Sequence, residues 1–187
     1  MSRHKKITIA ITGLNAIDSP GPGIAVIRAL REATSFDVRI IGLSYESLEP
    51  GIYMHDLIDK TYHIPYPSTG TRALLERIEY IHEKENLDLI IPNFDAELFP
   101  FIKIESTLAA MGIHTFLPTL QQFEERHKMN LPEFGKKYGF HVPDSANVFD
   151  VNEVQKALNG YDFPILVKGK YYDAHIAYNS DQVISYF

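Results

Sequence analysis

The chain has 187 residues, of which 45% are apolar and 22% are charged, and its formal net charge is −6 at pH 7. This composition is typical of a globular protein with one or two domains, and it excludes disordered and fibrous proteins. The sequence contains no cysteine, which excludes disulfides, thiolate nucleophiles and zinc–thiolate sites.

The sequence also argues against two kinds of partner. Binding to nucleic-acid phosphates requires clustered lysine and arginine, whereas the basic residues of this acidic chain are scattered. Every apolar run is far shorter than the ~20 residues that span a bilayer. The stretch after the N-terminal MSRHKK is interrupted by threonines and lacks a small-residue cleavage pattern. We therefore expect a cytoplasmic protein with no nucleic-acid partner and no membrane segment.

The first predicted elements are a strand, a tight loop and a helix. A β-branched run from Ile7 to Thr12 predicts a buried strand, and GLNAIDSPGPG after it predicts a turn. From Gly23 to Ala33, apolar residues recur at the spacing of one helix face.

Strands and helices then alternate as far as Pro118. Further strands are expected at residues 38–43, 61–64, 87–92 and 113–117, and further helices at residues 69–85 and 96–111. Alternation at this spacing indicates β–α–β crossovers and a parallel sheet. We therefore expect an α/β fold in which residues 1–118 form a Rossmann-like domain with a five-stranded parallel sheet.

A second, smaller α+β unit is expected over residues 119–187, where the alternation stops. After a polar stretch, short helices are predicted at residues 131–138 and 151–159. The apolar FPILVKGK then predicts a strand, residues 174–178 predict its partner, and SDQVISYF predicts a terminal helix capped by Ser180.

The loops after the first and fourth strands are candidate ligand sites, because open α/β sheets bind ligands at the carboxyl ends of their strands. In the first loop, Gly21 and Gly23 are expected to offer free backbone N–H groups at a helix start, which would favour an anion. They could equally serve the geometry of a proline-stiffened turn. In the second loop, NFDAELF, the candidates are Asp95 and Glu97, although Asp95 could instead cap the following helix.

Metal and hydrolase chemistry have no support in the sequence. The eight histidines lack the H-x-x-x-H and H-E-x-x-H spacings of metal sites, so solvated or structural histidines are expected. There is no G-x-S-x-G motif, and no Ser–His–Asp arrangement can be assembled from the sequence alone.

Lys168 is a sharper candidate. It ends the apolar strand of FPILVKGK, where a lysine is unfavourable unless its ammonium reaches water or an anion. A lysine held by a rigid strand is a well-placed point charge for a phosphate, but it could also mark only the place where the strand surfaces. Lys128 lies earlier in the same unit, just before a predicted helix, and strengthens the first interpretation.

Three segments carry a resemblance to a known family. They are ITGLNAIDSPGPGIAVIRALRE, then DLIIPNFDAELFPF followed by MGIHTFLP, and finally HKMNLPEFGKKYGFHVPDS leading into YDFPILVKGK. In this order they resemble the beginning of an ATP-grasp protein, in the branch similar to biotin carboxylase and to split forms of the carbamoyl-phosphate synthase large chain. The resemblance covers essentially the whole chain.

The resemblance implies a preATP-grasp domain that helps to bind the non-nucleotide substrate, followed by the small unit of the ATP-grasp fold. The candidate substrate-binding residues are then Asn15, Gly21, Gly23, Asp95 and Glu97.

In the family, two basic residues of the small unit contact ATP phosphates, and Lys128 and Lys168 match them. The implied reaction is activation of a small-molecule carboxylate as an acyl phosphate, followed by attack of an amine or another nucleophile. Cations at both lysines would stabilise charge on the transferring phosphoryl group.

The sequence departs from the family pattern in two ways. The family often has a glycine-rich loop after the second lysine, whereas GKYYDAHIAY has no further glycine, which makes Lys170 a candidate to compensate. The acidic and asparagine ligands for Mg²⁺ have no match in this chain, so they are expected outside it. We therefore predict that the chain alone is an inactive part of a ligase, completed by a C-terminal half in cis or as a partner chain, and that it could form a homodimer.

Two other functions remain open. The chain could be a non-catalytic Rossmann-like module that binds or senses a small metabolite through GLNAIDSPGPG. A nucleotide-sugar or dinucleotide enzyme would use the same sheet, but the acidic residue expected after the second strand is replaced by GLSYES, in which Glu46 comes late.

Overall fold

The computed structural model describes residues 6–16, 19–169 and 174–187 of the chain. The chain divides into two compact units, Met1–Leu120 and Gln121–Phe187, which we call unit 1 and unit 2. The domain boundary predicted from the sequence lies after residue 118, and the two predicted domains remain a prediction. None of the described helices combines the length and the apolar character needed to cross a membrane.

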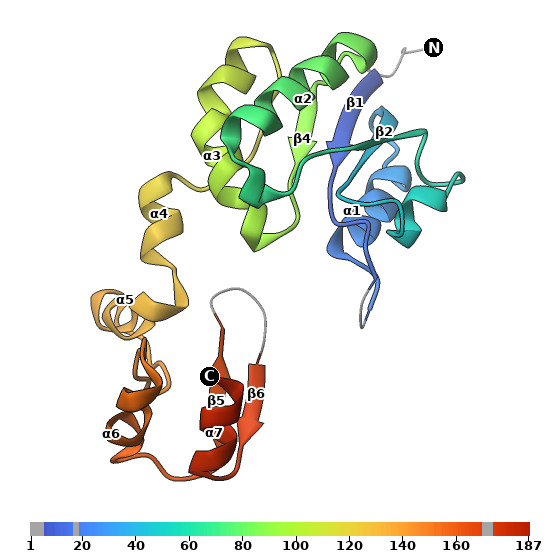
Figure 1. Ribbon diagram of the computed structural model, residues 1–187. Helices are drawn as coiled ribbons and strands as arrows, with labels where there is room; N and C mark the ends of the chain where they lie inside the picture. Colours follow the sequence, from blue (N-terminus) through green and yellow to red (C-terminus); the bar gives the residue numbers. More distant parts are fainter. Residues whose placement is uncertain (1–5, 17–18, 170–173) are drawn as a thin grey trace. The chain divides into compact units, whose positions relative to one another are not determined.

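Unit 1 is built on a parallel sheet of four strands (Figure 1). These are β1 (Lys6–Ile11), β2 (Asp37–Ser44), β3 (Lys60–His63) and β4 (Leu89–Ile91), in the spatial order β3-β2-β1-β4. β1 pairs with β2 on one side and with β4 on the other. The chain therefore adds β2 and β3 on one side of β1 and then crosses to its other side to add β4, so the strand order reverses at β1. Its sequence, KITIAI, is rich in the β-branched residues that suit a central strand.

Helices cover both faces of this sheet (Figure 1). They are α1 (Pro22–Arg31), α2 (Thr71–Glu85) and α3 (Asp95–Ala110). Ile9 and Ile11 of β1 pack into one buried cluster with Ile27 of α1, whereas Ala10 packs into another with Phe101 of α3. Because neighbouring residues of a strand point to opposite faces, a strand covered on both faces must be apolar almost throughout.

The expected five-stranded sheet is not confirmed. The segment at residues 113–117 makes a single parallel bridge, between Leu89 and His114, in place of a fifth strand. His114 N donates to Asp88 O at 2.9 Å, and Ile90 N donates to His114 O at 3.0 Å. Phe116, two residues after this bridge, is 99% exposed. The apolar run that predicted a strand therefore pairs with β4 only at His114 and then reaches the surface.

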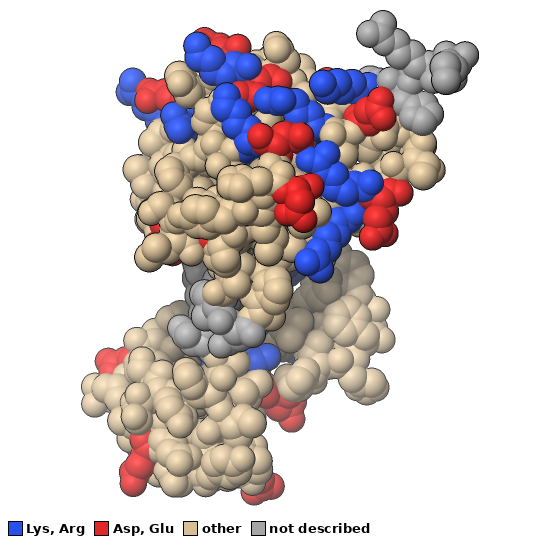
Figure 2. Space-filling view, turned by 90° about the vertical axis from the view of Figure 1, so that its right-hand side faces the viewer, with Lys and Arg blue, Asp and Glu red and all other residues tan. Residues whose placement is uncertain are grey.

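A buried carboxylate, Glu85, ties the end of α2 to the sheet. It accepts hydrogen bonds from Lys60 Nζ at 2.7 Å and Tyr62 OH at 2.5 Å, and it forms an ion pair with Arg39. Burial alone would raise the pKa of Glu85, but the hydrogen bonds from Lys60, Tyr62 and Arg39 lower it to about 2. On the face of unit 1 drawn in Figure 2, basic side chains (blue) and acidic side chains (red) lie next to one another.

Unit 2 contains short helices and one antiparallel strand pair. Its elements are α4 (Leu120–Glu125), α5 (Leu131–Tyr138), α6 (Val154–Leu158), β5 (Ile165–Lys168), β6 (Ala174–Ala177) and α7 (Ser180–Tyr186). α4 lies in the stretch that the sequence had suggested only as polar. The predicted cap of α7 is wrong by one residue, because Asn179 Oδ1, and not Ser180, accepts the backbone N–H of Gln182 at 2.9 Å.

The two faces of the β5–β6 pair differ. On one face, Ile165 and Val167 pack against a small buried cluster of Val154, Ala177 and Val183. On the opposite face, the cross-strand partners Leu166 and Ile176 are 52% and 55% exposed. This strand pair therefore has one covered face and one open apolar face.

Candidate functional site

The carboxyl ends of the four parallel strands in unit 1 bring their loops to one edge of the sheet. The loops after β1 and β4 are neighbours there, because β1 and β4 pair side by side. The strand order reverses at this point, and open α/β sheets bind ligands at such reversals. The edge is therefore the first place to look for a substrate site.

Glu97 is the centre of the hydrogen bonding at this edge, and it is only 1% exposed. Its carboxylate accepts from the hydroxyls of Thr12 after β1 and Tyr45 after β2. It also accepts from the backbone N–H groups of Asn93, at 2.6 Å, and Phe94, at 2.9 Å. Burial raises the pKa of Glu97, and these four donors oppose that rise. Sequence reasoning proposed Glu97 as a substrate contact, but its oxygens are engaged in joining three loops.

The glycines of the first loop are in close contact with the backbone around them. Gly21 N donates to Asn15 O at 2.6 Å and Gly23 N donates to Gly13 O at 3.1 Å, so the expectation that these N–H groups are free is wrong. A Cβ atom at Gly23 would lie 1.9 Å from Thr12 O. This close approach, rather than anion binding, explains why glycine is needed at Gly23.

Asp95 is exposed and is the first residue of α3. The alternative that Asp95 caps this helix is also wrong, because Phe94 is the N-cap residue and Glu97 accepts its backbone N–H. Among the predicted substrate residues, Asp95 is exposed and Asn15 is partly buried, whereas Gly21, Gly23 and Glu97 are buried. A role in binding remains a prediction for all five.

Three aromatic rings at the same edge were not expected from the sequence. Tyr45, Tyr66 and Phe94 follow β2, β3 and β4 respectively. The rings of Tyr45 and Tyr66 stack with centroids 5.4 Å apart and planes 15° apart, and the Phe94 centroid lies 6.4 Å from that of Tyr45. Their position directly after three predicted strands is the sequence signal that could have identified them.

In unit 2, Lys168 is the last residue of β5 and is exposed. It alternates with Leu166 along the strand, so it lies on the same open face as Leu166 and Ile176. Lys128 begins a short 3₁₀ turn and is also exposed. Lys170 lies outside the described part of the chain, and the phosphate contacts proposed for Lys128, Lys168 and Lys170 remain predictions.

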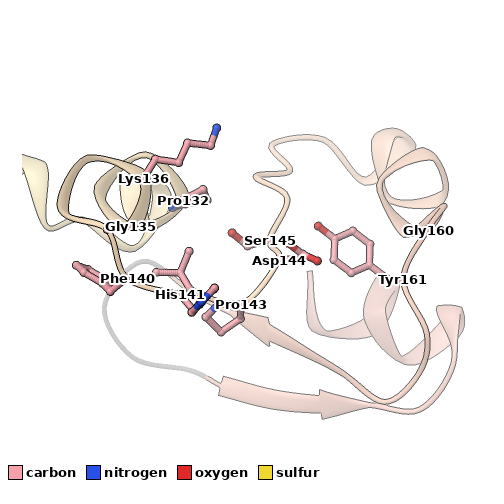
Figure 3. Close-up of a pocket in the computed structure, with 12 residues that line it drawn as sticks. Pro132, Gly135, Lys136, Phe140, His141, Pro143, Asp144, Ser145, Gly160 and Tyr161 are labelled. Atoms are coloured by element: carbon pink, nitrogen blue, oxygen red, sulfur yellow. The ribbon is translucent and has the colours of Figure 1, made fainter.

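Unit 2 also has an open cavity of about 680 Å³ beside the C-terminal end of α5. Its lining includes His141, Asp144, Ser145 and Tyr161 (Figure 3). Lys136 also lines it, but Lys136 Nζ pairs with Glu133 at 3.0 Å. Neither Lys128 nor Lys168 is among the described residues that line it.

Metal binding has no obvious place in the described residues. Over residues 6–16, 19–169 and 174–187, no three histidine, aspartate or glutamate side chains are grouped in a way that could hold a metal ion. The expectation that Mg²⁺ ligands lie outside this chain therefore stays a prediction.

No protein-family model and no curated protein matches the sequence. Solved structures do match it. N5-carboxyaminoimidazole synthetase from Staphylococcus aureus is 16% identical with a TM-score of 0.57, and the match covers 99% of this chain and 46% of that chain.

Two further solved structures give the same picture. The biotin carboxylase domain of a single-chain bacterial carboxylase is 12% identical with a TM-score of 0.54, covering 96% of this chain and 38% of that chain. L-amino acid ligase from Bacillus licheniformis is 11% identical with a TM-score of 0.58, covering 99% of this chain and 42% of that chain. At these identities the likeness concerns the fold. The chain spans less than half the length of each of these three structures.

Proposed function

We propose that this chain, which has the fold of the N-terminal part of ATP-grasp enzymes, is the front part of an ATP-dependent ligase. Such an enzyme activates a carboxylate and joins it to an amine or another nucleophile. The observation that carries the proposal is the extent of the match, which covers 96–99% of this chain and so includes both of its units. The matched structures include a synthetase, a carboxylase and a ligase.

In this proposal unit 2 contributes to the ATP site. The open face of β5–β6 combines two half-exposed apolar side chains, Leu166 and Ile176, with the ammonium of Lys168. Apolar side chains suit the flat base of a nucleotide, and a lysine at the end of a strand suits its phosphates. Lys128 is proposed as a second phosphate contact. Bound ATP would supply the phosphoryl group that activates the carboxylate.

Unit 1 contributes the substrate side. The loops after β1 and β4 meet where the strand order reverses, and Asn15 and Asp95 are the predicted polar side chains of these loops that solvent can reach. We assign them to the carboxylate substrate or to the attacking nucleophile. Glu97 has a positioning role, because it holds the loops through Thr12, Tyr45 and the backbone of Asn93 and Phe94.

The rest of the active site is proposed to come from protein outside this chain, in cis or as a partner. The described residues offer no cluster for Mg²⁺, and the matched chains are more than twice as long. The chain by itself is then expected to bind ATP without turning it over. The missing half, or a second copy of the chain, would then cover the nucleotide bound at Leu166 and Ile176 from its other side.

The test compares ATP affinity between the wild-type chain and Lys168→Ala by calorimetric titration. A lost charge-assisted contact to phosphate weakens binding about 10-fold or more. Lys128→Ala should act in the same direction. Lys156→Ala is the matched control, because Lys156 is an exposed lysine of α6 in the same unit. Equal affinities of Lys168→Ala and Lys156→Ala would remove Lys168 from the phosphate site.

The alternative of a metabolite-binding module has less support. It relies on GLNAIDSPGPG to bind a small metabolite, and the backbone N–H groups of Gly21 and Gly23 already donate within that loop.

A further inference from the structure

The stacked pair of Tyr45 and Tyr66 carries an inference about the substrate. The two rings lie at the edge of the sheet where the substrate side is proposed, and they come from the loops after β2 and β3. The position of the Tyr45 ring is fixed by its hydroxyl, which donates a hydrogen bond to the buried carboxylate of Glu97. A ring held in this way is a rigid base for the ring above it.

Tyr66 is held by its backbone as well as by the stack. It lies between Pro65 and Pro67, and a residue before proline is restricted to extended conformations. Its observed angles, φ −57° and ψ 149°, are of this kind. Tyr66 O also accepts the backbone N–H of Thr69 at 2.9 Å. Little further conformational freedom is then lost when a ligand binds to the ring.

The Tyr66 side chain is partly open to solvent. The ring lies nearly parallel to that of Tyr45, yet Tyr66 remains 53% exposed. Nearly parallel rings with centroids 5.4 Å apart are offset, so Tyr45 covers only part of the Tyr66 ring and the rest is accessible to a ligand. Large apolar rings held rigidly at the surface are typical of recognition sites.

From this arrangement we propose that Tyr66 is a specificity-determining residue that stacks on an aromatic or heteroaromatic ring of the ligase substrate. The inference rests on the proposed function, since it takes the carboxyl edge of the unit 1 sheet as the substrate side. A third ring would extend the stack of Tyr45 and Tyr66, and Phe94 would border it. Offset stacking of rings adds to the effect of apolar burial alone, so an aromatic ring is favoured over an aliphatic ring of similar size.

The test uses ligand-observed NMR titrations of the whole 187-residue chain. The probes are phenylacetate and phenethylamine, each compared with its cyclohexyl analogue. In at least one of the two pairs, the carboxylates or the amines, the aromatic probe should bind roughly 3- to 10-fold tighter than its cyclohexyl analogue. Tyr66→Ala should abolish this preference and Tyr66→Phe should retain it. Tyr53→Ala should also retain it, because Tyr53 is another tyrosine of unit 1, 61% exposed, whose hydroxyl donates to Ser47 O.

A second variant guards against misfolding. If Tyr66→Ala does not fold, Tyr66→Leu keeps an apolar side chain against Tyr45 without the ring, and it should also lose the preference. Absence of any aromatic preference in the wild type, or its persistence in both variants, would overturn the inference. ATP titrations on the same samples separate the two proposals. If the wild type shows no ring preference but has a Lys168-dependent ATP site, only this inference is overturned. If the wild type shows a Tyr66-dependent ring preference but no such ATP site, only the proposed function is overturned.

Discussion

Unit 1 and unit 2 differ in how fully their sheets are covered. In unit 1, helices pack on both faces, and large side chains such as Ile11 and Phe101 are completely buried. In unit 2, the buried cluster consists of Val154, Ala177 and Val183, and it lies on one face of the strand pair. The opposite face leaves Leu166 and Ile176 about half exposed.

Because of this difference, we expect the covered sheet of unit 1 to contribute mainly to stability and the open face of unit 2 to contribute mainly to binding. A sheet covered on both faces obtains its stability within its own unit, because burial of apolar surface is the main favourable contribution to folding. An exposed cross-strand pair of apolar side chains adds little to folding, and such surfaces are typical of ligand or protein contacts. Substitutions in the core of unit 1 should therefore affect mainly unfolding, and those on the open face of unit 2 should affect mainly binding.

The largest effect is expected at the core of unit 1. Phe101→Ala removes a completely buried ring and should lower the free energy of unfolding by about 3–5 kcal/mol. Phe99→Ala is the matched control, because Phe99 belongs to the same helix and is 42% exposed. Urea unfolding measures both. Equal losses would contradict the assignment of Phe101 to the core.

The next effect tests the hydrogen bonding at the edge of the sheet. Glu97→Ala leaves the hydroxyls of Thr12 and Tyr45 and two backbone N–H groups without their acceptor, so it should cost about 3 kcal/mol. Glu97→Gln keeps an acceptor of the same shape and should cost distinctly less. If thermal unfolding finds both variants equally stable, the carboxylate does not hold the loops together.

Glu85 should give stability a dependence on acidic pH. Its pKa is lowered to about 2 in the folded chain, below the usual value near 4.5, so ionisation of Glu85 favours folding. The contribution is fully present above about pH 4.5 and is lost as the pH falls through about 2.

Glu85→Gln measures this contribution. At pH 7 it should lower the free energy of unfolding by about 2 kcal/mol after allowance for solvent screening. The difference from wild type should shrink as the pH falls from 4.5 towards 2. Glu79→Gln, on the exposed side of the same helix, is the control. A difference for Glu85→Gln that is independent of pH over this range would refute the ionic contribution.

The smallest effects compare the two faces of the β5–β6 pair. Val183→Ala, on the covered side, should lower the free energy of unfolding by about 1.5 kcal/mol. Leu166→Ala, on the open side, should lower it by about 0.5 kcal/mol or less. Chemical denaturation of both variants checks the order. A larger loss for Leu166→Ala would show that the open face is part of the core.

Strands β1, β2 and β4 were predictable because each contains a short apolar run with a strong local signal, whereas β3, with the sequence KTYH, is largely polar. Local pattern could not distinguish a fifth strand from the single bridge at His114, because that depends on what pairs with the segment. It also could not reveal that Gly21 and Gly23 use their N–H groups within their own loop.

The same limit applies to the candidate site. Glu97 was recognised from its position after the fourth strand, but its burial beneath Tyr45 depends on contacts between residues far apart in the sequence. The stack of Tyr45 and Tyr66 was missed for the same reason, since it forms only when the loops after β2 and β3 meet.

The most direct test of the account is where Mg·ATP binds on the chain, mapped by backbone chemical-shift changes in a two-dimensional NMR titration. The account predicts that the changes concentrate at Leu166, Lys168 and Ile176, on the open face of unit 2, and disappear in Lys168→Ala. Changes confined to the cavity around Asp144 and Tyr161, or an unaltered titration of Lys168→Ala, would contradict it.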